Sequence, residues 1–205
     1  MLNAVTCIKK LKDIQLNQCK RLRIISGTLK GKKLFSLPGG NIRPTSDRIK
    51  ESIFNILPSL DPETVVLDLF AGTGSLSLEA LSRGAAYAVL IDNAKASINV
   101  IHRNLIACRF MDRSKVIVWD IVMNLDCLMR SPRKFNLIFM DPPYGKNMIR
   151  PTLSNLIQNH IMAKNARIII EHSQQEPLQN LQAQITVSDE RRYGKTLVSF
   201  LRYML

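Results

Sequence analysis

Short apolar runs recur along the chain and are separated by segments in which apolar residues have helical spacing. An uninterrupted apolar run is typical of a strand that is buried on both faces of a sheet. Such runs occupy residues 64–70, 88–91, 116–119, 137–140 and 167–171, and two further strands are predicted near 184–191 and 196–204. Helices are predicted between them at 72–83, 93–107, about 121–129 and about 151–162. This alternation predicts βαβ units that form a mainly parallel sheet covered by helices on both faces.

The direction of the strands is predicted to change near the end of the chain. The last two predicted strands are separated only by a tight turn around Gly194, so one of them must run antiparallel to the other. We therefore expect an α/β fold with a doubly wound, seven-stranded sheet, mostly parallel, that ends in an antiparallel C-terminal strand pair.

The first part of the chain has a different organisation. Residues 1–20 show no periodicity and are predicted to be a mobile leader. Residues 21–45 are predicted to form an N-terminal basic β-hairpin extension, because weakly alternating apolar positions flank a turn rich in lysine and glycine. A helix is predicted to begin near Thr45 or Ser46 and to stop at Pro58, and residues 46–205 are predicted to form the main domain.

Positive charge is concentrated at the start of the chain. The formal net charge is +13, and residues 1–50 hold twelve Lys or Arg against Asp13 and Asp47, a net charge of +10. Such a concentration attracts a polyanion such as nucleic acid, whose counterions are released on binding. The charge alone fits a solvated basic tail equally well.

Several classes of protein are excluded. Apolar residues make up 46% of the chain and charged residues 22%, values typical of a folded domain rather than a disordered one. No apolar run is long enough to span a bilayer and the first twenty residues hold no apolar signal region, so we expect a cytoplasmic protein. The four cysteines form no Cys-x-x-Cys pair and the three histidines are scattered, so no metal site is predicted.

Acidic residues follow three of the predicted strands, and the carboxyl ends of parallel strands meet at one edge of the sheet. A glycine-rich turn, Asp68-Leu-Phe-Ala-Gly-Thr-Gly74, joins the first strand to its helix, and Asp92 ends the next strand. A carboxylate in the position of Asp92 can accept hydrogen bonds from both hydroxyls of a ribose. Asp68 would repel a pyrophosphate and attract a cation, and Ser77 replaces the third glycine of the dinucleotide fingerprint. Ribose binding next to a cation is the outline of S-adenosylmethionine.

The third strand end carries the tetrapeptide Asp141-Pro142-Pro143-Tyr144. Two prolines make the loop rigid and leave the Pro142 carbonyl free of local helix use. The Asp141 carboxylate and this carbonyl can accept both hydrogens of an exocyclic amine on a base, which directs the nitrogen lone pair towards an electrophilic methyl group. The Tyr144 ring can stack on a base that has been flipped out of its helix. The tetrapeptide therefore predicts methyl transfer to an amino group of a base.

These motifs resemble the class I S-adenosylmethionine-dependent methyltransferases, which have a Rossmann-like fold, and within them the bacterial RsmD family. The resemblance runs from about residue 21 to the end of the chain and is carried by three stretches, Arg23–Leu34, Arg43–Arg48 and Leu67–Gly84. It implies transfer of a methyl group from S-adenosylmethionine to N2 of a guanine in 16S ribosomal RNA, at the family's guanine-966 site. The implied partner is this RNA or the small ribosomal subunit, and we expect the protein to be a monomer.

The resemblance also implies roles by position. The turn residues Asp68, Phe70, Ala71, Gly72 and Gly74 would bind the methionine end of the cofactor, Asp92 the ribose, and Asn93 and Asp120 the adenine. The catalytic set that holds the guanine would be Asp141, Pro142 and Tyr144. The substrate-binding residues near the cofactor would be Lys30, Lys32, Lys33, Arg43, Thr45 and Arg48.

Three other functions stay open from the sequence. An adenine-N6 DNA methyltransferase shares the tetrapeptide, but the chain has little room for a separate target-recognition region. A non-catalytic RNA-binding module on the same fold would bind RNA without S-adenosylmethionine. An NAD-dependent oxidoreductase is disfavoured by Asp68 and Ser77.

Overall fold

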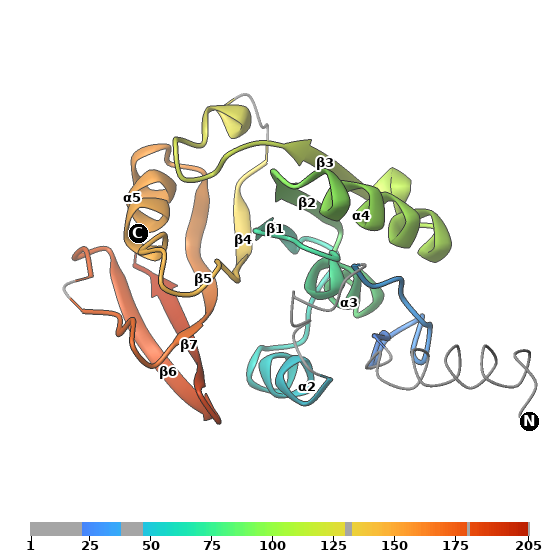
Figure 1. Cartoon of the computed structure of the whole chain (residues 1–205), viewed down its shortest axis with the longest axis horizontal. Coiled ribbons are helices and arrows are strands. Elements are labelled where there is room, and N and C mark those ends of the chain that lie inside the picture. Colours follow the sequence, from blue (N-terminus) through green and yellow to red (C-terminus); the bar gives the residue numbers. More distant parts are fainter. Residues whose placement is uncertain (1–21, 38–46, 130–132, 180, 205) are drawn as a thin grey trace, which may run out of the picture.

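The computed structural model describes residues 22–37, 47–129, 133–179 and 181–204. The predictions for residues 1–20, Arg43 and Thr45 fall outside these residues. In the described part, one seven-stranded sheet runs through the molecule in the order β3-β2-β1-β4-β5-β7-β6 (Figure 1). The predicted α/β class is confirmed.

The strands have the predicted mixture of directions. Five of them pair in parallel: β1 (Val65–Leu69), β2 (Tyr87–Asp92), β3 (Ser114–Val118), β4 (Phe135–Met140) and β5 (Met162–Ser173). Next to the far edge, β7 (Thr196–Tyr203) is antiparallel to both β5 and β6 (Ile185–Tyr193). The strand order reverses between β1 and β4, and α/β sheets bind ligands at the carboxyl ends of strands at such a reversal.

Helices cover both faces of the sheet. One face carries α2 (Asp47–Ile56), α3 (Ser75–Ser82) and α4 (Lys95–Cys108), and the other carries α5 (Ile149–Gln158). Successive strand residues point to opposite faces, so in β1 Val66 belongs to one core cluster and Leu67 to the other. No helix in the described ranges has the length and apolar content that crossing a bilayer requires.

The stretch predicted as a helix at 121–129 is different in the structure. It is a turn followed by a short 3₁₀ helix, η2 (Asp126–Leu128). The Asp120 carboxylate accepts a hydrogen bond from the Val122 amide at 3.2 Å, and the Asn124 side chain accepts one from the Asp126 amide at 3.1 Å. Short polar side chains that capture nearby amides compete with helical hydrogen bonds, and here they prevent a regular helix. Another 3₁₀ helix, η1 (Met111–Arg113), links α4 to β3.

The described N-terminal segment, residues 22–37, packs on α3. The two predicted short strands lie antiparallel, with one bridge between Arg23 and Lys33 and backbone hydrogen bonds from Leu34 to Leu22 at 2.8 Å and from Ile24 to Lys32 at 2.9 Å. The tip of this hairpin is bound to α3, because the Thr28 amide donates to the Ser82 carbonyl at 2.8 Å. As a result every residue of α3 is buried, including its polar ones.

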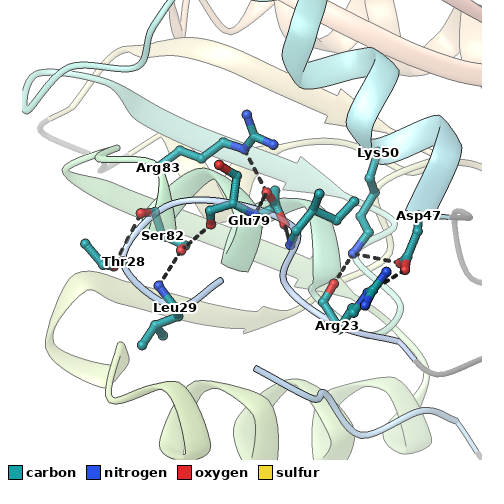
Figure 2. A network of polar contacts seen from close by, with 10 residues as sticks. Arg23, Thr28, Leu29, Asp47, Lys50, Glu79, Ser82 and Arg83 are labelled. Carbon is teal, nitrogen blue, oxygen red and sulfur yellow. Dashed lines mark hydrogen bonds and ion pairs between the residues drawn. The ribbon is translucent and has the colours of Figure 1, made fainter. Parts of the chain in front are cut away.

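A buried carboxylate joins this segment to α3. Glu79 is fully buried in the middle of the helix, and its two oxygens accept hydrogen bonds from the Ile25 amide at 2.6 Å and the Ser26 amide at 2.9 Å (Figure 2). The Arg83 guanidinium donates to the same carboxylate at 2.7 Å and supplies the opposite charge. A buried charge is tolerated only when it is paired and hydrogen-bonded, and Glu79 meets both conditions.

A buried lysine joins the same segment to α2. The Lys50 ammonium donates to the Arg23 carbonyl at 2.5 Å and lies 3.9 Å from the Asp47 carboxylate (Figure 2). Burial lowers the pKa of Lys50, while Glu79 and Asp47 oppose that change. Arg23 also donates to Asp47 at 2.9 Å, so the segment contacts both helices through polar groups.

We expect Gly27→Ala to be strongly destabilising, because its backbone lies against α3. Gly27 has φ +81°, and an added Cβ would lie 1.9 Å from the Ser82 carbonyl oxygen. The left-handed backbone costs about 1 kcal/mol for alanine and the overlap adds roughly 1–3 kcal/mol more. Gly31→Ala is the matched control, since Gly31 has φ +83° and a Cβ added there would meet nothing within 4 Å. Urea unfolding should show a clearly larger loss for Gly27→Ala; equal losses would contradict the close packing.

Candidate active site

The carboxyl ends of β1, β2 and β4 surround one cavity of about 640 Å³. These ends lie together because β1 pairs in parallel with both β2 and β4. Eight of the residues predicted for the site line the cavity: Phe70, Gly72, Asp92, Asn93, Asp120, Asp141, Pro142 and Tyr144. The topology thus brings residues from separate parts of the chain into one place.

The glycine-rich turn has a strained backbone. Phe70 has φ +64°, a value that a bulky side chain rarely adopts, and Gly72 follows with φ +58°. The turn is held by a hydrogen bond from the Ala71 amide to the Ile91 carbonyl at 3.0 Å. A Cβ added at Gly72 would meet only the Phe70 carbonyl oxygen, at 3.9 Å, so the backbone here faces open space. Strain of this kind is maintained where the backbone must approach a ligand.

The Asp92 carboxylate connects the end of β2 to this turn. One oxygen accepts a hydrogen bond from the Gly72 amide at 2.8 Å and the other accepts one from the Ala94 amide at 2.8 Å. An ionised carboxylate can accept about four hydrogen bonds, so both oxygens keep capacity for further donors from the cavity. Asp92 is therefore oriented by the backbone and still able to bind two hydroxyl groups.

Asp68 lies beneath the turn and does not line the cavity. It is buried, as are Ala71 and Gly74, and its carboxyl group accepts a hydrogen bond from the Ser77 hydroxyl at 2.8 Å. Burial raises the pKa of Asp68 to about 7, with a smaller contribution from the Asp92 charge and with the Ser77 hydrogen bonds opposing the shift. The sequence suggested direct contact with a cation, whereas the structure places this carboxyl group in a supporting position below the turn.

The loop after β4 presents Asp141, Pro142 and Tyr144 to the cavity. The Tyr144 hydroxyl donates to the Glu171 carboxylate at 3.2 Å and lies 3.1 Å from the Thr196 hydroxyl. Burial of the hydroxyl raises the pKa of Tyr144 to about 12, and the neighbouring carboxylates add to this shift. The residue as a whole is 45% exposed, so the hydroxyl is fixed while part of the side chain is accessible.

Several lining residues were not predicted from the sequence. The walls also include Ala94, Ser97, Trp119, Ile121, Val122, Met123, Pro143, Met148 and Glu171. The Trp119 indole donates to the Asn124 carbonyl at 3.1 Å, which holds the loop after β3 against the cavity. The position of Glu171 at the end of a predicted strand was a usable signal. Thr196 carried no signal, because its place beside Tyr144 depends on the antiparallel pairing of β7 with β5.

The described basic residues predicted to contact substrate do not line the cavity. The side chains of Lys30, Lys32 and Lys33 are exposed at a turn beside Ser82, in the last turn of α3, and Arg48 is exposed on α2. The sequence predicts these residues near the cofactor, but α3 leads away from the glycine-rich turn, so its far end lies away from the cavity. Lysines near a helix C-terminus are also favoured by the helix dipole.

The polar groups of the cavity are suited to an organic ligand. They are carboxylates and backbone groups on rigid loops, which accept hydrogen bonds from hydroxyl and amino groups. In the part of the chain that the structure describes, no group of three or more His, Cys, Asp or Glu is arranged to hold a metal ion.

Comparison with known proteins gives consistent relationships. The family model described as Conserved hypothetical protein 95 matches residues 22–202. A Haemophilus influenzae protein named Ribosomal RNA small subunit methyltransferase D is 32% identical over 169 residues, covering 82% of this chain and 88% of that protein. A protein of the same name from Escherichia coli is 31% identical over 175 residues, covering 85% of this chain and 86% of that protein.

Solved structures show the same architecture. A structure from Escherichia coli superposes with a TM-score of 0.76 at 28% identity and covers 90% of this chain and 98% of its own. A structure of a Haemophilus influenzae protein gives a TM-score of 0.75 at 30% identity, with coverage of 90% and 99%. The shared architecture therefore extends over most of this chain and nearly all of each relative.

We expect the raised pKa of Asp68 to appear in the pH dependence of stability. The folded protein keeps a proton on Asp68 up to about pH 7, whereas the unfolded chain loses it near the ordinary value of 3.8. The free energy of unfolding should therefore fall as the pH rises between these values. Asp68→Asn removes this effect, and the variant should match the wild type near pH 4 and exceed it by roughly 2–4 kcal/mol near pH 8.

Urea titrations at both pH values measure this difference. The control is Asp112→Asn, an exposed aspartate on η1 that should change stability equally little at either pH. If the free energy of unfolding of the wild type changes with pH as little as that of Asp68→Asn, the raised pKa of Asp68 is contradicted.

Proposed function

This chain belongs to the family described as Conserved hypothetical protein 95, the RsmD family, and from that premise we propose that it methylates N2 of a guanine in 16S ribosomal RNA. The methyl donor is S-adenosylmethionine. The observation that carries the proposal is the single cavity lined by the glycine-rich turn, Asp92 and the Asp141–Tyr144 loop.

The cavity has the size and chemistry that the donor requires. Its volume of about 640 Å³ lies within the range of roughly 300–1,000 Å³ that is typical of small-molecule sites. Asp92 offers a carboxylate to the two ribose hydroxyls, and Asn93 and Asp120 line the cavity as polar residues beside Ile121. Gly72 gives space for the methionine end against the backbone. These residues fit a nucleoside with a charged, non-phosphate extension.

The tetrapeptide after β4 supplies the acceptor side of the reaction. When bound, S-adenosylmethionine supplies a methyl group on a positively charged sulfur. The Asp141 carboxylate and the Pro142 carbonyl accept the two hydrogens of the guanine N2 amine and direct its lone pair towards that methyl group. Asp141 takes the released proton as the N2–carbon bond forms and the carbon–sulfur bond breaks, leaving its electron pair on sulfur. Positioning of the two partners supplies most of the rate enhancement.

Tyr144 provides the surface on which the guanine stacks. Its hydroxyl is held by Glu171 and Thr196, so the ring cannot rotate away from the cavity. A guanine in a folded RNA must leave its stack to reach this ring. The names of the relatives and the net charge of +13 both support an RNA substrate. The exposed Lys30, Lys32, Lys33 and Arg48 then contact phosphates outside the cavity.

We expect Asp141→Ala to abolish methyl transfer while leaving cofactor binding intact. Loss of the acceptor for the amine should lower kcat at least about a hundredfold. Calorimetry with S-adenosylmethionine should give a Kd within about threefold of the wild type, because Asp92 and the turn are unchanged. Asp126→Asn, an exposed aspartate on η2, is the control and should have full activity.

The assay for this prediction also decides between the possible substrates. Small ribosomal subunits, free 16S ribosomal RNA and DNA are incubated with labelled S-adenosylmethionine, and the nucleosides are separated by mass. N2-methylguanosine in RNA is the expected product. N6-methyladenine in DNA would overturn the proposal. If the protein does not bind S-adenosylmethionine, the proposal also fails, and a non-catalytic RNA-binding module is the function that fits.

The ring of Tyr144 should matter more than its hydroxyl. Tyr144→Ala removes the stacking surface and should reduce kcat/KM by roughly 10- to 100-fold, since base stacking on an aromatic ring contributes about 1–3 kcal/mol. Tyr144→Phe keeps the ring and loses only the contacts with Glu171 and Thr196, so it should stay within about fivefold of the wild type. Equal losses in the two variants would contradict stacking.

A further inference from the structure

Two arginines form an unusual pair on the sheet, away from the proposed active site. Arg167 on β5 and Arg202 on β7 are directly opposite each other in the antiparallel ladder. Residues in such a pair project from the same face of the sheet, with Cβ atoms about 5 Å apart. Like charges in this position are destabilising unless an anion lies between them.

Protein groups in the described ranges do not neutralise this pair. Among the described residues, neither guanidinium makes a hydrogen bond or an ion pair. The Asp189 carboxylate, which lines the same cavity, accepts hydrogen bonds from Arg191 at 2.9 Å and 3.1 Å. Burial and the neighbouring Arg202 charge both lower the pKa of Arg167. The end of α2 contributes only about half a negative charge from its dipole. The pair therefore keeps a net positive charge.

The two arginines line a small cavity. It has a volume of about 280 Å³ and is also lined by Ile56 and Leu57 at the end of α2 and by Ser188, Ile169, Phe200 and Leu201 of the sheet. The hydroxyls of Ser52 and Tyr193 contact each other and hold α2 against β6. The volume is just below the range of about 300–1,000 Å³ typical of sites for whole small molecules. It suits a phosphate group that belongs to a longer molecule.

The position of the cavity relates it to the proposed substrate. Glu171, which lines the proposed active site, is four residues beyond Arg167 on β5 and on the same face of the sheet. At about 3.3 Å per residue this separates them by roughly 13 Å, a distance that a few nucleotides can span. The guanidinium group of an arginine often binds a phosphate through two parallel hydrogen bonds.

We propose that Arg167 and Arg202 together bind one phosphodiester of the RNA backbone at a second contact, outside the methyl-transfer cavity. This inference rests on the proposed RNA substrate and adds a contact that orients the RNA on the α2 face of the sheet. Because one phosphate is shared by two guanidiniums, removal of either side chain should lose most of the contact.

The test measures RNA affinity as a function of salt. Fluorescence anisotropy with labelled polyuridylate over a range of KCl concentrations gives the slope of log affinity against log salt, which is about 0.7 per neutralised phosphate for a single strand. Arg167→Gln and Arg202→Gln should each lower affinity by roughly fivefold and the slope by about 0.7. The double variant should lose no more than either single one, because they share a phosphate.

A matched pair of variants separates this model from simple loss of charge. Arg192→Gln removes one exposed positive charge from β6 outside the cavity. Any loss of RNA affinity in Arg192→Gln should add to the loss in Arg167→Gln, because the two residues would contact different phosphates. The losses in Arg167→Gln and Arg202→Gln should not add. Additive effects of the cavity pair, or unchanged slopes, would overturn the proposal. Thermal unfolding verifies that the variants fold, and loss of one like charge should raise the Tm without ligand.

Two further measurements separate an RNA contact from a free-anion site, and failure of this proposal from failure of the proposed function. If inorganic phosphate binds the wild type and not the variants while the polyuridylate slope stays unchanged, the site holds a free anion and the RNA assignment fails. Methyl transfer at saturating RNA should have the wild-type kcat in both single variants, because neither residue lines the active-site cavity. A wild type that methylates no RNA would refute the proposed function, while the salt slope would still test the arginine pair.

Discussion

The buried carboxylate of Glu79 is the interaction on which the arrangement of the N-terminal half depends. It lies inside a helix that would otherwise present a polar face to solvent, and it binds two consecutive amides of the N-terminal segment. Its charge is compensated by Arg83. Loss of one partner from such a buried, paired charge is costly, so the segment and α3 are held together as one unit.

This unit extends to the proposed active site. The Asn104 side chain accepts a hydrogen bond from the Phe35 amide at 2.7 Å and donates to the Phe35 carbonyl at 3.1 Å. It also donates to the Thr73 carbonyl at 2.9 Å, within the glycine-rich turn. Asn104 is fully buried, so these contacts exclude water. The segment therefore supports the strained turn from behind, while Asp92 holds it from the cavity side.

The cavity itself combines fixed and accessible groups. Asp92 is oriented by two amides, and the Tyr144 hydroxyl is held between β5 and β7. Both residues nevertheless keep surface towards the cavity. Groups whose rotamers are set by surrounding hydrogen bonds lose little entropy when a ligand binds, which is the property that a positioning catalyst needs.

The local pattern by itself determined the alternation of strands and helices outside residues 121–129, the antiparallel ending at Gly194 and the three strand ends that form the cavity, because periodicity and turn residues act over short distances. Only the tertiary structure decided that Asp68 supports the turn from below, that Glu79 binds the N-terminal hairpin to α3, and that Thr196 lies beside Tyr144. The same is true of the Arg167 and Arg202 pair. These features depend on which segments pack together, and burial changes the free energy of charged and polar groups in ways that neighbouring residues in the sequence do not reveal.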